Sequence, residues 1–144
     1  MTPRQELVLA ALSAGQTNSE LSPAQTQKLF FLIDQNVAGA LGGPLFNFEP
    51  YDYGPFDSAV YSDLDCLSGF SGHVDVNRNG RYRTYRLTDL GRQVGEAKLA
   101  TLNPEARDYL PRARDWVASL SFQDLVRAIY QAYPAMRAKS IFRG

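Results

Sequence analysis

The spacing of apolar residues predicts a mainly helical chain whose helices begin at recognisable caps. Thr2-Pro3 and Ser22-Pro23 are each followed by a Gln three positions after the hydroxyl residue. In a capping box the hydroxyl accepts a backbone N–H, and the Gln side chain reaches back to the cap. We therefore predict one helix that closes at Gly15 and a second from 23 to about 40. Residues 29–33 are apolar on all sides, which predicts that the second helix is the buried centre of the fold.

The third predicted helix spans 55–69 and follows an aromatic segment that starts at Tyr51. We place Pro55 in its first turn, where the missing N–H costs nothing, and Gly69 at its end as a left-handed cap. A short strand is expected just before this segment, over 45–48. The predicted buried stripe of the helix consists of Phe56, Ala59, Val60, Leu64 and Leu67.

A two-stranded hairpin is predicted over 74–87, because Asn79-Gly80 suits a type I′ turn, which needs positive φ at both central residues. This turn would pair Val76 with Arg83 and Val74 with Tyr85. Val74, Val76, Tyr85 and Leu87 would then share a face.

A fourth helix is predicted from Thr88 as its cap to about residue 100. Its apolar stripe would be Leu90, Val94 and Ala97. Gly91 and Gly95 lie one turn apart and would let another element approach closely.

Two further helices follow, starting at Asn103-Pro104 and at Ser121, and Pro111 is expected to kink or divide the first of them. Trp116 is assigned to the buried face of that helix. The face assigned to the last helix consists of Leu125, Val126, Ile129, Tyr130 and Tyr133.

The predicted fold class is mainly α (α+β): a winged-helix-like core with a two-stranded hairpin wing and a C-terminal helical extension. The order of helix, helix, helix, hairpin and helix is the winged-helix order. We predict a core over 1–102 and an extension over 103–144 that packs on the same domain, since a chain of 144 residues is an ordinary length for one domain.

The formal net charge is zero, but the charges are segregated along the chain. Residues 29–77 hold seven acids and no Lys or Arg, whereas 78–144 carry a net charge of +7. Such segregation of charge along a chain gives information about binding partners and association rather than about the fold. The alternative is that the two sets interleave in space and cancel.

The chemical inventory predicts a protein that is not an enzyme and needs no cofactor or metal. The chain has one histidine, His73, and one cysteine, Cys66, which cannot make a zinc site and are a poor basis for a thiol nucleophile. The acids between 49 and 65 are interpreted as a solvated face rather than a magnesium site. No signal peptide and no span of roughly 20 apolar residues is present, so we expect a cytoplasmic protein with no membrane partner.

A longer likeness involves Gln27-Lys28-Leu29-Phe30-Phe31, the run from Phe48 to Pro55, Val60-Tyr61 and Leu64. These landmarks, over roughly 20–92, resemble the SocA-like (Panacea) antitoxin domain and similar small bacterial proteins. The resemblance implies a helical, winged-helix-like module that binds a partner protein such as a toxin or a proteolysis substrate.

Two functional hypotheses follow. The first is a non-enzymatic protein-binding module, antitoxin-like or a phage-defence or regulatory accessory protein, whose partner is a toxin or defence effector. Its contact residues would be Tyr51, Tyr53, Asp57, Tyr61 and Asp65, because tyrosines supply contact area and acids steer a basic partner. The alternative is a winged-helix regulator that contacts DNA through Arg78, Arg81, Arg83 and Arg86. A homodimer is compatible with both.

Overall fold

The structure, a computed structural model, describes residues 1–78, 80 and 82–144 and has a mostly helical α+β fold. Six α-helices, two antiparallel hairpins and two 3₁₀ turns make up the described part of the chain. In chain order they are α1 (Pro3–Ser13), α2 (Pro23–Asn36), η1 (Ala38–Leu41), β1 (Glu49–Tyr51), β2 (Gly54–Phe56), α3 (Ser58–Ser68), β3 (Val74–Asn77), β4 (Thr84–Leu87), α4 (Asp89–Thr101), α5 (Pro104–Ser119), α6 (Phe122–Ala132) and η2 (Pro134–Arg137). None of the helices in the described part is long and apolar enough to cross a membrane.

Both predicted capping boxes are confirmed. The Thr2 hydroxyl accepts from Gln5 N at 3.1 Å, and Gln5 Oε1 accepts from Thr2 N at 3.1 Å. Ser22 and Gln25 form the same pair of bonds before α2. α2 ends at Asn36 rather than near 40, and the remaining residues form η1 instead.

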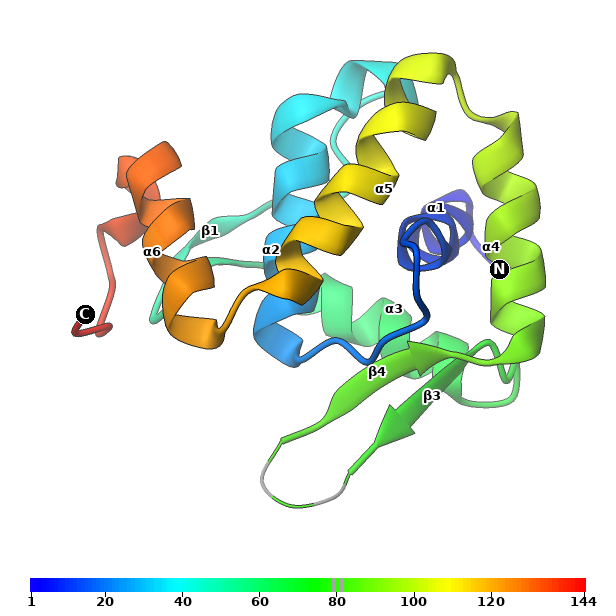
Figure 1. The fold of residues 1–144 in the computed structure, drawn as a ribbon, viewed down its shortest axis with the longest axis horizontal. Coiled ribbons are helices and arrows are strands. Elements are labelled where there is room, and N and C mark those ends of the chain that lie inside the picture. Colours follow the sequence, from blue (N-terminus) through cyan, green and yellow to red (C-terminus); the bar gives the residue numbers. More distant parts are fainter. Residues whose placement is uncertain (79, 81) are drawn as a thin grey trace.

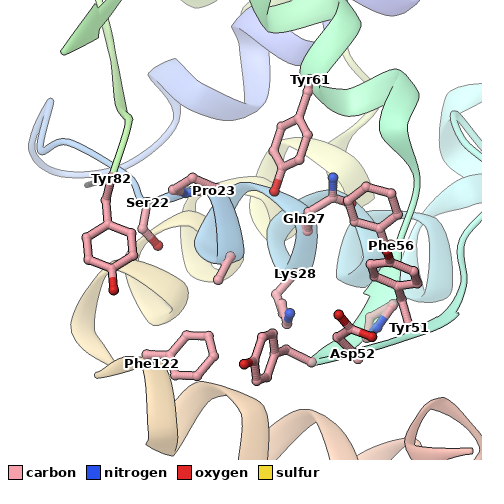
Figure 2. Close-up of a pocket in the computed structure, with 14 residues that line it drawn as sticks. Ser22, Pro23, Gln27, Lys28, Tyr51, Asp52, Phe56, Tyr61, Tyr82 and Phe122 are labelled. Atoms are coloured by element: carbon pink, nitrogen blue, oxygen red, sulfur yellow. The ribbon is translucent and has the colours of Figure 1, made fainter. Parts of the chain in front are cut away.

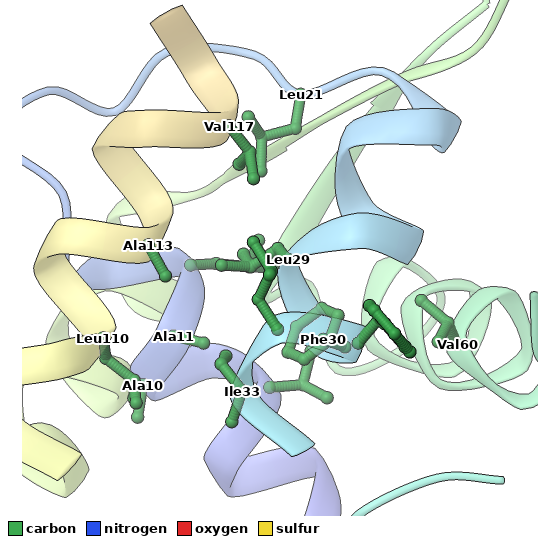
Figure 3. Packing of buried hydrophobic residues seen from close by; sticks show 14 of the residues in the cluster. Ala10, Ala11, Leu21, Leu29, Phe30, Ile33, Val60, Leu110, Ala113 and Val117 are labelled. Atoms are coloured by element: carbon green, nitrogen blue, oxygen red, sulfur yellow. The ribbon is translucent and has the colours of Figure 1, made fainter. Parts of the chain in front are cut away.

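The core is built around α2, as predicted. Residues 29–33 are all buried, and Leu29 and Phe30 are fully inaccessible. α1 lies between α4 and α5, while α5 packs along α2 (Figure 1). Figure 3 shows side chains of α5, including Leu110 and Val117, in the same core as Leu29 and Ile33. The segment beyond residue 103 therefore completes the core.

α3 starts later than predicted, because residues 54–56 form β2 and Asp57 caps the helix through its bond from Ala59 N. Pro55 thus lies in a strand, opposite Pro50, where neither residue can donate to the ladder. The strand expected over 45–48 is also wrong, since β1 covers Glu49–Tyr51. Gly69 does end the helix, but with φ −74° it is not the left-handed cap that was expected.

α4 packs against the core through its glycines and through Val94, but the other two residues of the predicted stripe are exposed. Leu90 is 47% exposed and Ala97 is exposed. Gly91 and Gly95 are buried, and a β-carbon on either would overlap a carbonyl oxygen, that of His73 or of Leu9 respectively. The segment before β3 therefore approaches α4 closely at Gly91 and α1 does so at Gly95, so the glycine face is buried and Leu90 is exposed.

The β3–β4 hairpin forms where predicted but in a different register. Val76 pairs with Tyr85 and Val74 with Leu87, two residues away from the predicted pairing. A shift of two keeps every side chain on its face, so Val74, Val76, Tyr85 and Leu87 share a face as predicted. Val74, Tyr85 and Leu87 are buried. Backbone bonds between Leu21 and Tyr85 hold β4 from its other edge. The predicted Asn79-Gly80 turn cannot be compared, because Asn79 lies outside the described residues.

α5 continues undivided through Pro111, and Trp116 is 39% exposed rather than buried. The buried face of α5 instead includes the guanidinium of Arg114, which donates to the carbonyl oxygens of Leu12 and Ser19. α6 begins at its predicted Ser121 cap and buries Leu125, Val126, Ile129 and Tyr130, while Tyr133 is half-buried.

Candidate functional site

A pocket of about 780 Å³ opens where the start of α2, the β1–β2 hairpin, α3 and α6 meet (Figure 2). The residue Tyr82, next to β4, contributes to its edge. We call it the aromatic pocket, after its aromatic lining of Tyr51, Tyr53, Phe56, Tyr61, Tyr82 and Phe122. Its volume falls within the range of about 300–1,000 Å³ that is usual for ligand pockets.

The β1–β2 hairpin forms one wall, and its turn depends on Gly54, whose φ of +111° is unfavourable for other residues. The carbonyl oxygen of Asp52 accepts from Ile141 N at 2.9 Å, so the C-terminal tail fixes the hairpin from outside. Ser140 Oγ donates to the same oxygen at 3.4 Å. The position of this wall of the pocket therefore depends on hydrogen bonds from the C-terminal tail.

Several aromatic side chains of the pocket are in contact with one another. Tyr51 stacks on Phe56 with ring centres 4.9 Å apart, and Tyr53 meets Phe122 edge-on at 5.1 Å. Tyr51 is nevertheless 52% exposed, Tyr53 42% and Phe122 44%, so their outer faces form a rim. Clusters of exposed aromatic rings around a pocket are unusual on a surface that contacts only water.

Tyr61 connects the pocket with the β3–β4 hairpin. Its ring lies 5.8 Å from that of Phe56 and 6.5 Å from that of Tyr85. The guanidinium of Arg83 lies 5.7 Å from the centre of the Tyr61 ring, within cation–π distance. Burial raises the pKa of the Tyr61 hydroxyl, so this group is neutral at physiological pH.

Lys28 supplies the one cationic group among the described residues that line the pocket. Its side chain points from α2 towards the pocket and the β1–β2 hairpin (Figure 2). The residue is only 3% exposed, and burial lowers its pKa from 10.5 to about 8. Lys28 forms neither a hydrogen bond nor an ion pair with any residue that the structure describes.

The structure brings together three of the five residues predicted to bind a partner: Tyr51, Tyr53 and Tyr61 all line the pocket. Asp57 has a structural position instead, contrary to the expectation that it points outward. Its carboxylate accepts from Asn47 N at 2.8 Å and from Ala59 N at 2.9 Å. Asp57 therefore caps α3 and ties the preceding loop to it.

Asp65 is exposed as predicted, but it lies 3.8 Å from the guanidinium of Arg83. Asp63 is buried and pairs with Arg4 at 2.7 Å. Asp75 stands opposite Arg86 in the β3–β4 ladder. Acids of the negative segment thus meet arginines from elsewhere in the chain, which is the interleaved arrangement left open as the alternative.

The arginines of the predicted DNA-binding set differ in their surroundings. Arg78 and Arg86 are exposed on the β3–β4 hairpin, while Arg83 is half-buried against Tyr61 and Asp65. Arg81 lies outside the described residues.

Cys66 and His73, for which no catalytic or metal-binding role was predicted, differ in their surroundings. Cys66 is exposed, and the buried Nδ1 of His73 has no hydrogen-bond partner in the described part of the chain. Within that part, no group of three or more His, Cys, Asp or Glu side chains is placed to hold a metal ion.

Sequence reasoning missed Lys28, Tyr82 and Phe122 as pocket residues. Lys28 did carry a signal, because it stands at the start of the fully apolar run 29–33 on a helix predicted to be buried. A cation in such a position requires either a partner or an opening to solvent. Tyr82 and Phe122 carried no local signal, since their position at the rim depends on tertiary packing.

Comparison with known proteins adds no family assignment. No protein-family model matches the sequence, and no curated protein matches it.

Proposed function

We propose that the protein is a non-enzymatic protein-binding module and that it captures a short segment of a partner polypeptide in the aromatic pocket. The observation that supports this most directly is the convergence of exposed aromatic side chains from separate elements on one pocket. Tyrosine and phenylalanine are enriched where binding energy concentrates, because they bury a large area at a small cost in side-chain entropy.

The acidic residues play a smaller part in this proposal than the sequence had indicated. Asp57 is used as a helix cap and Asp65 lies beside Arg83, so neither is a free charge for a basic partner. Apolar contact in the pocket replaces charge attraction as the main source of affinity.

The biological role that we propose is antitoxin-like or that of a phage-defence or regulatory accessory protein. This part of the proposal rests on the resemblance to the SocA-like (Panacea) domain. We also interpret α1, α2, α3, the β3–β4 hairpin and α4 as a winged-helix-like arrangement, since their order is that of a winged helix.

The test uses rim residues that are exposed, so that the fold is preserved. Tyr53→Ser combined with Tyr82→Ser should leave the thermal melt unchanged within a few degrees and reduce partner capture from the native host at least about tenfold. Phe70→Ser is the matched control, since Phe70 is a fully exposed aromatic residue outside the pocket lining. Capture that survives the double change, or that is lost equally in the control, contradicts the proposal.

DNA binding is a second candidate, supported by the exposed Arg78 and Arg86 on a hairpin that projects from the helices (Figure 1). α3, which would occupy the recognition position, bears no basic residue. A gel shift with the protein's own upstream DNA should then weaken with salt and with Arg78→Ala plus Arg86→Ala. No shift at low salt would remove this candidate.

A further inference from the structure

Lys28 has an unusual position for a lysine, because its charge is buried and no counter-ion stands beside it among the residues that the structure describes. A β-carbon placed on Gly54 would lie 3.6 Å from Lys28 Cε and 3.7 Å from Nζ, so the amine sits directly under the turn of the β1–β2 hairpin. The residue is only 3% exposed, and it lines the aromatic pocket. Buried ammonium groups are normally paired, since losing hydration without compensation is costly.

The charged groups near Lys28 do not supply this pairing. Asp52 lines the same pocket, yet no ion pair joins it to Lys28 among the described residues. Gln27, the neighbouring polar residue, already uses its amide to donate to the carbonyl oxygen of Asp57 and to accept from Asp57 N. Among the described residues that line the pocket, Lys28 is therefore the one charged group that is buried and has no hydrogen-bond or ion-pair partner.

The surroundings indicate which anion would fit. A phosphate group carries nearly two negative charges and is usually bound by several donors or by arginine, whereas one ammonium in an apolar pocket balances a single charge. Asp52 nearby would further disfavour a dianion. A carboxylate attached to an apolar or aromatic group matches both the single cation and the aromatic walls.

We propose that the aromatic pocket binds the C-terminal end of a partner polypeptide, with an apolar last side chain between the aromatic walls and its terminal carboxylate paired with Lys28. An internal acidic side chain fits less well, because it would bring two stretches of backbone into an apolar pocket and leave their polar groups unsatisfied. This inference rests on the proposed function and specifies the part of the partner that is captured.

The experiment compares two forms of one peptide library. Immobilised tetrapeptides with three randomised C-terminal positions are prepared with either a free carboxylate or a carboxamide, and binding of the purified protein to each is measured. The wild type should bind the best carboxylate peptides about tenfold or more tightly than their amides, which is the usual strength of a hydrogen-bonded charge. Equal binding of the two forms, or binding of neither, overturns the inference.

Two variants test whether the amine of Lys28 causes the preference for carboxylate peptides over amide peptides. In Lys28→Met the ratio of carboxylate to amide affinity should fall to about one, while affinity for the amides is retained. In Lys139→Met, an exposed lysine at the other end of the chain, the ratio should be unchanged. If the ratio of carboxylate to amide affinity stays high in Lys28→Met, the proposed role of Lys28 is refuted. Misfolding cannot explain that result, because binding of the amide peptides shows that the pocket is intact.

A third arm separates the polypeptide from a small acid. If 3-phenylpropionate binds in a Lys28-dependent manner and no peptide does, the pocket serves a small organic acid and the peptide assignment is wrong. The rim variants Tyr53→Ser and Tyr82→Ser could abolish partner capture while Lys28→Met does not. The proposed protein-binding function would then be supported, and the inference that Lys28 pairs with a C-terminal carboxylate would be refuted.

Discussion

Replacing Lys28 by methionine should make the protein more stable at neutral pH. Methionine has nearly the same length as lysine and carries no charge, so it fills the same space in the pocket floor. Burial lowers the pKa of Lys28 from 10.5 to about 8, and each unit corresponds to about 1.4 kcal/mol. The charged amine therefore costs the folded state about 3 kcal/mol at pH 7, and Lys28→Met should raise the free energy of unfolding by that order.

The same shift predicts a specific pH dependence. The folded-state pKa lies below the unfolded one, so the unfolded chain holds more protons between pH 8 and pH 10.5. The wild type consequently gains stability relative to Lys28→Met as the pH rises through this window. The difference between the two proteins should be constant below pH 8 and should shrink by about 3 kcal/mol by pH 10.5.

The measurement is urea unfolding followed by circular dichroism at several pH values from 7 to 10.5. Tyrosines and other groups also titrate in this range, but they do so in both proteins and cancel in the difference. Lys139→Met, at an exposed site, serves as the control and should change the unfolding free energy by less than about 0.5 kcal/mol. A Lys28→Met protein that is less stable at pH 7, or a difference that does not vary with pH, refutes the reasoning.

Three further changes test the packing around the site by urea unfolding. Asp57→Ala should cost about 1–2 kcal/mol, because α3 loses its cap and the amide of Asn47 loses its acceptor; an unchanged midpoint would mean that Asp57 is free for a partner after all. Gly95→Ala should cost about 2 kcal/mol or more, since the added carbon overlaps the carbonyl oxygen of Leu9, and a stabilising effect would contradict the close packing of α1 and α4. Tyr85→Phe should be neutral or stabilising by up to about 1 kcal/mol, because the hydroxyl is buried with no hydrogen-bond partner among the described residues; a clear loss of stability would show that the hydroxyl is bonded.

Much of the secondary structure was predictable because it depends on residues close together in the sequence. The boxes at Thr2 and Ser22 each need two side chains three positions apart, and both formed as expected. The faces of the β3–β4 hairpin also followed from the sequence, because the actual register differs from the predicted one by two residues and such a shift leaves each side chain on its face. The burial of 29–33 required only that the run be apolar on all sides.

The errors arose where a distant element decided the outcome. β4 is bonded not only to β3 but also, on its other edge, to Leu21 from another part of the chain, and the register of β3 and β4 differs by two residues from the one that the turn predicted. The buried face of α4 was decided by how closely His73 approaches Gly91 and α1 approaches Gly95, and no hydrophobic pattern encodes these distances. From the sequence, Asp57 was interpreted as an exposed acid on a helix. In the structure its carboxylate accepts a hydrogen bond from Asn47 N, in the loop before it.

The sequence by itself determined where helices begin, which strand faces are apolar and which helix is central, since these follow from caps and periodicity over a few residues. It also placed Lys28 beside a buried apolar run. Only the tertiary structure decided that this lysine has no counter-ion among the described residues and that Tyr53, Tyr82 and Phe122 line the same pocket. Such a pocket is made by chain segments that meet only after folding, and the balance of charge and apolar surface inside it depends on every element that reaches it.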